Sequence, residues 1–141
     1  MTLRIAPVDP SHIQQVWPRV ESYIKDALQK GMPEGMGNYN EHHVQSFVTS
    51  GQWLLLVAVD DQNEIHGAAT VSFLSYPLHR VAFVTTIGGK LISNDDTFGQ
   101  LKDILKQRGA TKIQGACREA VARLWKRYGF EPSTTIVEVK L

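Results

Sequence analysis

The chain has 141 residues, of which 43% are hydrophobic, and its 15 basic and 14 acidic side chains leave a net charge of +1. This length suits a single domain, residues 1–141, and the balanced charge argues against nucleic acid or an anionic membrane surface as a partner. No apolar run reaches the roughly 20 residues that span a bilayer, and a single cysteine with no secretory signal predicts a cytoplasmic protein.

The first segments predict a strand and a long helix. Residues 3–5 alternate between apolar and polar, and Asp9 and Pro10 then offer a capping residue and a proline at the first helical position. Apolar residues recur at helical spacing from 13 to 28, with Pro18 inside the pattern. We therefore expect one amphipathic helix that Pro18 kinks or splits in two.

The middle of the chain predicts a loop, a short helix and a hairpin. The stretch 30–40, KGMPEGMGNYN, is irregular and is either a substrate lid or a plain surface connection. Asn40 can cap a short helix that Gly51 ends. Residues 53–59 are apolar throughout, which predicts an interior strand covered on both faces, and residues 65–75 alternate as its hairpin partner.

A strand, a helix and another strand follow. Residues 81–87 alternate, and a helix is predicted from Phe98 to Arg108, with a capping box formed by Thr97 and Gln100 at its start. Residues 112–118 alternate again. Because two strands joined through a helix usually lie side by side in the same direction, we expect these two to pair in parallel.

The remaining sequence predicts one more helix and one more strand. The helix should bury a stripe made of Val121, Leu124, Trp125 and Tyr128. Residues 135–141 alternate and predict a terminal strand. The whole pattern indicates an α/β (α+β) fold with a mixed, mostly antiparallel sheet of about six strands and about four helices.

This order of elements, together with RLWKRYGF from Arg123 to Phe130, resembles the GNAT superfamily of acyl-CoA N-acyltransferases. The segments VWPRVESYIKDAL, QWLLLVAV and VEVKL also look like small GNAT-like proteins encoded by phages. The resemblance implies a sheet that splays between its fourth and fifth strands, acetyl-CoA in that cleft, and a small-molecule or protein amine that attacks the thioester. It does not indicate an oligomeric state.

The resemblance also implies a cofactor site in two parts. The fourth strand of the family carries a bulge near the thioester, and paired glycines late in the strand place it at Gly88, unless they only form the turn out of the strand. The start of the next helix would present backbone N–H groups to the CoA pyrophosphate. The residues assigned to the cofactor are Ile87, Gly88, Gly89, Thr97, Phe98 and Gly99.

Three positions depart from the family pattern. Asp96 stands where the family has Arg or Gln, and Leu101 stands where it has Gly or Ala. A carboxylate about 6 Å from a phosphate repels it by roughly 1 to 3 kcal/mol, while a helix start attracts an anion by roughly 0.3 to 2 kcal/mol. Asp95 and Asp96 could therefore cancel that attraction, so acetyl-CoA should bind weakly or not at all, and residues 94–97 could be no more than a helix cap. The third departure is Trp125, at the position of the family's general acid.

The catalytic residues are less defined. An indole cannot supply a proton, which leaves Tyr128 as the candidate acid, although packing is its alternative role. His66 and His79 flank strands and could each be a base or a structural residue. Cys117 is expected to face the sheet interior, and no metal-ligand spacing occurs. Two functions remain: an acetyl-CoA-dependent N-acetyltransferase with an atypical cofactor site, or an inactive GNAT-fold interaction or structural protein of phage origin.

Overall fold

A five-stranded sheet in the order β1-β2-β3-β4-β5 forms the centre of the computed structural model, which describes residues 2–30 and 38–141. The strands are β1 (Arg4–Val8), β2 (Trp53–Val59), β3 (Ile65–Ser75), β4 (Arg80–Gly89) and β5 (Lys112–Gly115). Neighbouring strands are antiparallel except β4 and β5, which are parallel. The mixed, mostly antiparallel sheet and its parallel last pair are confirmed, but the strands in the described residues number five rather than six.

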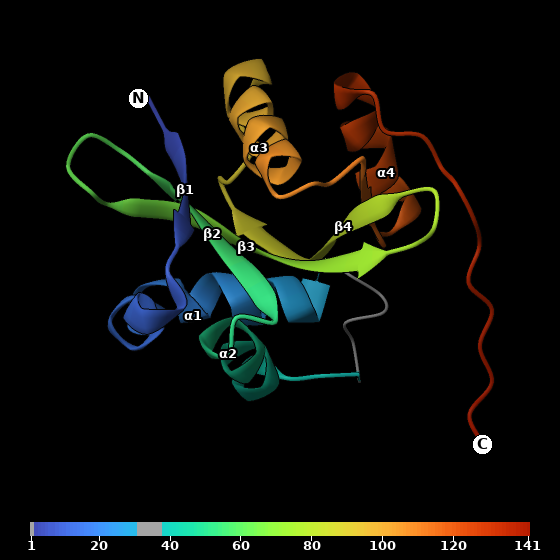
Figure 1. Ribbon diagram of the computed structural model, residues 1–141, viewed down its shortest axis with the longest axis horizontal. Coiled ribbons are helices and arrows are strands. Elements are labelled where there is room, and N and C mark those ends of the chain that lie inside the picture. The colour runs from blue at the N-terminus through green and yellow to red at the C-terminus, as the bar shows by residue number, and fades with distance from the viewer. Residues whose placement is uncertain (1, 31–37) are drawn as a thin grey trace.

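Two helices cover each face of the sheet (Figure 1). Helices α1 (Ile13–Lys30) and α2 (Glu41–Thr49) lie on one face, and α3 (Asp95–Gln107) and α4 (Glu119–Trp125) lie on the other. The apolar strand β2 contributes side chains to the hydrophobic core on both faces of the sheet. Leu55 and Val57 pack with α1 and α2, and Leu56 packs with α3. The prediction that this strand is interior and covered on both faces is confirmed.

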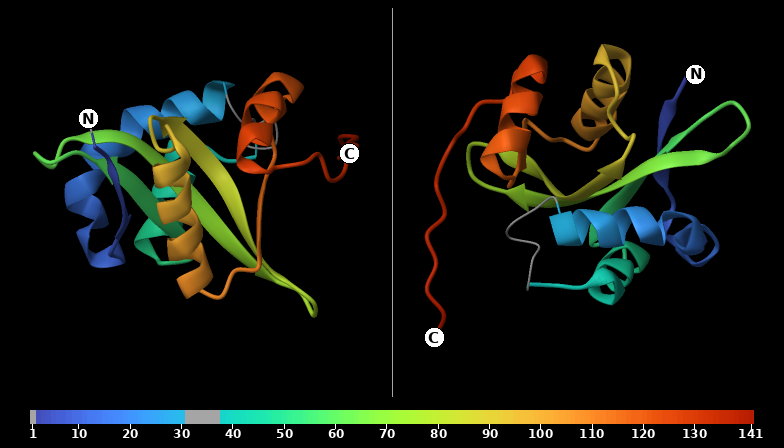
Figure 2. Two further views of the ribbon diagram at one scale, coloured as in Figure 1. Left: turned by 90° about the horizontal axis from the view of Figure 1, so that it is seen from above. Right: turned by 180° about the vertical axis from the view of Figure 1, so that it is seen from behind.

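Helix α1 is continuous through Pro18 but changes direction along its length, as the two views in Figure 2 show. Pro18 therefore kinks the helix and does not split it, as expected where a residue lacks the N–H of the helical ladder. Asp9 accepts a hydrogen bond from the Ser11 N–H, 2.9 Å long, and so caps a short 3-10 helix that leads into α1. None of the helices in the described residues is long and apolar enough to cross a membrane.

Helix α2 begins at its predicted cap, where the Asn40 side chain accepts hydrogen bonds from the N–H groups of His42 and His43. The preceding loop, predicted at 30–40 as a lid or a surface connection, lies for the most part outside the described residues, since 31–37 are not described.

Helix α3 starts earlier than predicted. Its capping box joins Asn94 and Thr97, not Thr97 and Gln100. The Gln100 side chain instead reaches β1, where it accepts from the Ile5 N–H at 2.8 Å and donates to the Leu3 carbonyl at 3.2 Å. Gln100 thus ties the outer edge of β1 to α3.

The C-terminal part differs most from the sequence prediction. Strand β5 ends at Gly115, so Cys117 lies in the following connection and not in the strand. Leu124 is 69% exposed and is not part of a buried stripe. Residues 131–141 form no strand and are all exposed, and they run along the outside of the molecule (Figure 1).

Candidate functional site

The second half of β4 has a neighbouring strand on one side only. Strand β5 pairs with Val81–Val84 and ends there, whereas β4 continues to Gly89 beside β3. The sheet therefore opens between its fourth and fifth strands, as the family resemblance implies. An open strand edge presents N–H and C=O groups that can bind a ligand lying extended along it.

A β-bulge lies at the point where β4 and β5 separate. Thr86 pairs with Thr70 and Val84 pairs with Val71, so Thr85 is the extra residue. The prediction of a bulge at Gly88 is wrong by three residues, because Gly88 pairs regularly with Ala68. A bulge of this kind needs one unpaired residue but no glycine. The prediction relied on the two adjacent glycines and therefore placed the bulge in the wrong part of the strand.

Three buried threonine hydroxyls surround the bulge. The Thr70 hydroxyl lies 2.7 Å from that of Thr85 and 2.6 Å from that of Thr86, and the Thr85 hydroxyl also donates to the Thr70 carbonyl at 3.0 Å. The Thr85 carbonyl accepts a hydrogen bond from the Tyr39 hydroxyl at 3.3 Å. Sequence analysis overlooked this cluster, although the threonine pair after Val84 was a visible signal of it.

We expect Thr70→Val to destabilise the protein by about 1 to 3 kcal/mol, because the fully buried Thr86 hydroxyl loses its partner at 2.6 Å. The double variant Thr70→Val with Thr86→Val should lose less than the sum of the two single changes, since it removes both partners. Urea unfolding of the four proteins measures this coupling. Strict additivity would show that the hydroxyls do not interact.

The glycines Gly88 and Gly89 serve the packing of α1. A β-carbon at Gly88 would lie 2.5 Å from the Tyr23 carbonyl oxygen, so only glycine lets α1 approach β4 this closely. Gly89 has a φ of 67° and makes the turn out of the strand, which was the alternative role of the pair. Ile87 packs against the core on the side of α3, which keeps it beside the open edge.

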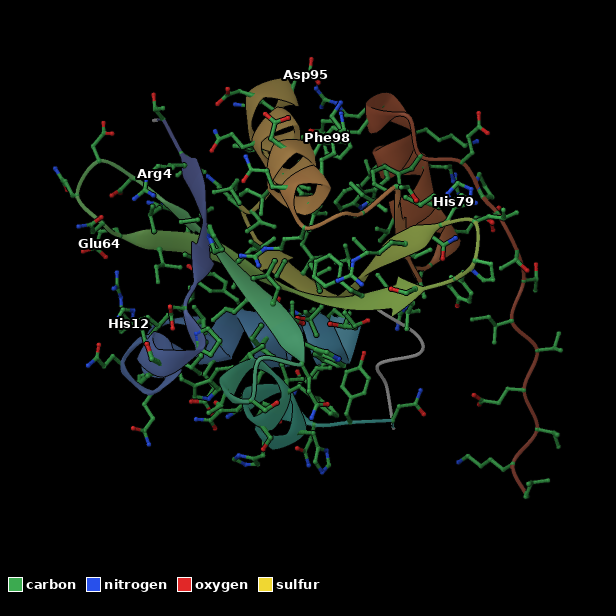
Figure 3. The ribbon with its side chains drawn as sticks, in the orientation of Figure 1. Arg4, His12, Glu64, His79, Asp95 and Phe98 are labelled. Atoms are coloured by element: carbon green, nitrogen blue, oxygen red, sulfur yellow. The ribbon has the colours of Figure 1, made fainter. Side chains whose placement is uncertain are left out.

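The N–H groups at the start of α3 are partly in use. The Thr97 N–H donates to the Asn94 side chain at 2.9 Å, and the Phe98 N–H donates to the Asn94 carbonyl at 3.1 Å. Asp95 and Asp96 are the first two helical residues, and Thr97 follows them as the third, in the first turn. Figure 3 shows Asp95 at the end of α3. This arrangement fits a self-capped helix and does not fit a pyrophosphate.

Leu101, which stands where the family has Gly or Ala, lies away from the anion-binding end of α3. Its side chain is 2% exposed and belongs to the core between α3 and the sheet. The departure from the family pattern at Leu101 is therefore a packing feature, and the charge of Asp95 and Asp96 is what opposes an anion.

An aromatic cluster joins α3 to the C-terminal region. The Phe98 ring centroid lies 5.0 Å from that of Tyr128 and 5.7 Å from that of Phe130, and the Trp125 centroid lies 5.1 Å from that of Phe130. Trp125 and Tyr128 are half-buried. Both residues therefore have packing contacts, although neither is as buried as the predicted stripe requires.

Neither histidine candidate lies near the bulge. His66 Nε2 is 2.8 Å from an Asp60 carboxylate oxygen, and this hydrogen bond lowers the pKa of Asp60. The His66 carbonyl accepts a hydrogen bond from the Lys90 N–H. Lys90 follows Thr85 by five residues, so His66 lies about 16 Å along the strand from the bulge. His79 Nδ1 is 2.9 Å from the Thr111 hydroxyl, in the loop before β4 shown in Figure 3. Both are placed as structural residues.

A cavity of about 550 Å³ lies at the opposite end of β4. It is bounded by Arg80 and Arg108 and by apolar groups such as Trp53 and Phe73. None of its lining residues belongs to the predicted cofactor site. The open edge of β4 after Val84, and not this cavity, contains residues of the predicted cofactor site.

No family model matches the chain, and no curated protein matches its sequence. Solved structures do resemble it over nearly its whole length. An aminoglycoside acetyltransferase from an uncultured soil metagenomic sample has a TM-score of 0.68 at 16% identity, covering 100% of this chain and 99% of that one. A ribosomal-protein-alanine N-acetyltransferase from Brucella melitensis has a TM-score of 0.68 at 14% identity, covering 99% of each chain.

A third similar structure is a predicted acetyltransferase from Clostridium acetobutylicum with acetyl-CoA, at a TM-score of 0.64 and 17% identity, covering 99% of this chain and 96% of that one. At these identities the similarity concerns the fold. The chain has the GNAT acetyltransferase fold, in agreement with the resemblance that its sequence carries.

Proposed function

We propose that this protein is an acetyltransferase that transfers an acetyl group from acetyl-CoA to the amine of a small molecule or protein in the cytoplasm. One observation carries the proposal: β4 leaves β5 after Val84 and has its bulge at Thr85, inside the opening. A structure of the same fold that contains acetyl-CoA supports the choice of donor.

The residues of β4 would hold the donor and orient the reacting groups. The open edge after Val84 offers backbone hydrogen bonds to the amide-bearing arm of the cofactor, and the threonine cluster fixes the backbone at the bulge. Bound acetyl-CoA supplies a thioester, whose C–S bond breaks as the amine nitrogen forms the new C–N bond. The amine loses a proton, and the departing sulfur gains one.

The two parts of the predicted cofactor site differ in how well they suit acetyl-CoA. The β4 edge suits an extended chain, whereas the start of α3 combines two carboxylates with N–H groups of which some are already hydrogen-bonded. We therefore expect the affinity for acetyl-CoA to come from the β4 edge and to be low.

An NMR titration with acetyl-CoA, followed by an assay of free thiol release with a panel of amines, tests the proposal. Amide resonances of residues 85–89 should shift more than those of α3, and at least one amine should increase thiol release above hydrolysis. Shifts confined to the cavity beside Arg80 and Arg108, or no shift at millimolar acetyl-CoA, would contradict the proposed site.

The second candidate function is a GNAT-fold interaction or structural protein without cofactor, of phage origin. The capping box of Asn94 and Thr97 favours it, because the helix start satisfies part of its N–H groups without a ligand. Under this alternative neither the β4 resonances nor the thiol signal would respond to acetyl-CoA.

We expect Tyr128→Phe to leave acetyl transfer nearly unchanged. The Tyr128 ring packs against Phe98, and the Arg127 guanidinium lies 5.1 Å from its centroid, contacts that phenylalanine preserves. Turnover of the purified variant with the best amine measures this. A large loss of turnover with an unchanged melting temperature would instead make Tyr128 the general acid.

A further inference from the structure

The cavity at the start of β4 has an apolar floor. Leu54 and Phe73 line it from the sheet, and both are half-buried. Side chains two residues apart on a strand share a face, so these two lie on the face where Leu56 and Val71 are 0% exposed beneath α3. The apolar face is thus covered in its centre but stays open beside the cavity. The cavity volume of about 550 Å³ is within the roughly 300 to 1,000 Å³ of small-molecule pockets.

Arg80 is held in place at one wall of this cavity. Its Nε donates to the Arg108 carbonyl at 3.0 Å, and one of its Nη atoms donates to the Ser75 hydroxyl at 2.8 Å. Its guanidinium carbon lies 4.7 Å from the centroid of the Phe73 ring. These contacts fix the plane of the guanidinium but use only two of the five N–H groups of an arginine. An arginine that is oriented in advance loses less conformational entropy when it binds an anion.

A second arginine, Arg108, lines the cavity from the end of α3, and neither arginine has an acidic partner. No salt bridge among the described residues involves either side chain. The surrounding sequence offers no partner, because residues 65–94 and 104–118 contain no Asp or Glu. Asp9 is the acidic residue of the lining, and its carboxylate accepts from the N–H and the hydroxyl of Ser11. Two positive charges therefore outweigh one negative charge at this site.

From these features we propose that the cavity binds a small molecule in which an anionic group, a carboxylate or a phosphate, is joined to an apolar body. The forked N–H groups of arginine match the oxygens of either anion. The apolar body lies on Leu54 and against the ring of Phe73, where its removal from water adds to the affinity. Arg80 is the first residue of β4 and the open edge begins after Val84, so this site does not depend on the proposed acetyltransferase activity.

NMR titrations with four probes test which parts of such a ligand are recognised. Phenylphosphate and phenylacetate carry both parts, inorganic phosphate carries only the anion, and benzyl alcohol carries the ring without a charge. The first two should shift the amide resonances of residues 51–54 and of Arg80. The tighter of these two should bind at least about tenfold more tightly than inorganic phosphate or benzyl alcohol, because each of those lacks one set of contacts. It also identifies the preferred anion as phosphate or carboxylate.

Three variants test the role of charge at the cavity. Arg108→Gln should weaken the tighter probe about tenfold at an unchanged melting temperature, because the guanidinium of Arg108 bonds to no other described residue. Lys106→Gln is the matched control, since it removes the same charge from α3 outside the lining, and its affinity should stay within about twofold of the original. Asp9→Asn keeps a capping side chain and removes the acidic charge, so it should bind the probe about twofold to fivefold more tightly.

Four results would overturn the proposal. The first is that neither anionic probe shifts these resonances at millimolar concentration, or that the shifts lie only at the β4 edge. The second is that benzyl alcohol binds as tightly as the anionic probes, which would exclude a role for the arginines. The third is that inorganic phosphate binds as tightly as phenylphosphate and phenylacetate, which would exclude the apolar floor. The fourth is an equal loss of affinity in Arg108→Gln and Lys106→Gln, which would reduce the effect to the overall charge of the protein.

Discussion

Gly88→Ala should destabilise the protein by about 3 kcal/mol or more and lower its melting temperature by roughly 10 °C, although the change adds one methyl group. The added β-carbon would lie 2.5 Å from the Tyr23 carbonyl oxygen and 3.2 Å from its carbon. Both atoms belong to the backbone of α1, so no side-chain rotation can relieve the contact. Either the helix or the strand must move.

Gly99→Ala is the matched control for this change. A β-carbon at Gly99 meets nothing within 4 Å, and the residue lies inside α3. Alanine should therefore stabilise the protein by about 0.5 to 1 kcal/mol, because glycine is a poor helix former. Thermal and urea unfolding of both variants measure the difference. Equal stabilities would show that α1 does not lie this close to β4 in solution.

Removing the charges at the start of α3 should strengthen acetyl-CoA binding about tenfold to a hundredfold. Asp95 and Asp96 are the first two residues of the helix. A single charge about 6 Å from a phosphate costs roughly 1 to 3 kcal/mol, depending on the local dielectric. The variant Asp95→Asn with Asp96→Asn relieves this repulsion and keeps the side-chain sizes. Calorimetric titration with acetyl-CoA compares it with the original protein.

Asp103→Asn is the control, because it removes one carboxylate charge of the same kind about two turns further along α3, at an exposed position. Its affinity for acetyl-CoA should equal that of the original protein. Added salt should narrow the difference between the original protein and the Asp95 and Asp96 variant, since exposed charges are screened. Unchanged affinity in that double variant would mean that the phosphates bind away from α3.

The local pattern of apolar and polar residues was sufficient to predict the strands in the interior of the sheet. Residues 53–59 are apolar throughout, and a run of this length between turn residues fits a strand covered on both faces. The parallel pairing of β4 and β5 followed from the helix between them. These predictions succeeded because the residues concerned pack on more than one side.

The errors share a different cause, which is the dependence of a segment on distant neighbours. The alternation of residues 135–141 indicates a preference for extended backbone, but a strand also requires a pairing edge, and no local pattern specifies which one. The cap of α3 shows the same ambiguity. Both Asn94 and Thr97 can cap a helix, and the choice is settled by burial of Thr97, which is 1% exposed. The bulge at Thr85 likewise depends on how β3 pairs with β4.

The side chain of Gln100 has a consequence for how far the protein can assemble. Its amide occupies the N–H of Ile5 and the carbonyl of Leu3, so the outer edge of β1 has fewer groups to offer to an incoming chain. A sheet with two equally open edges can extend in both directions and build a fibre. Here one N–H and one C=O of the β1 edge are already hydrogen-bonded to an amide from α3, so the addition of another strand is less favourable at β1 than at an edge whose groups are all free.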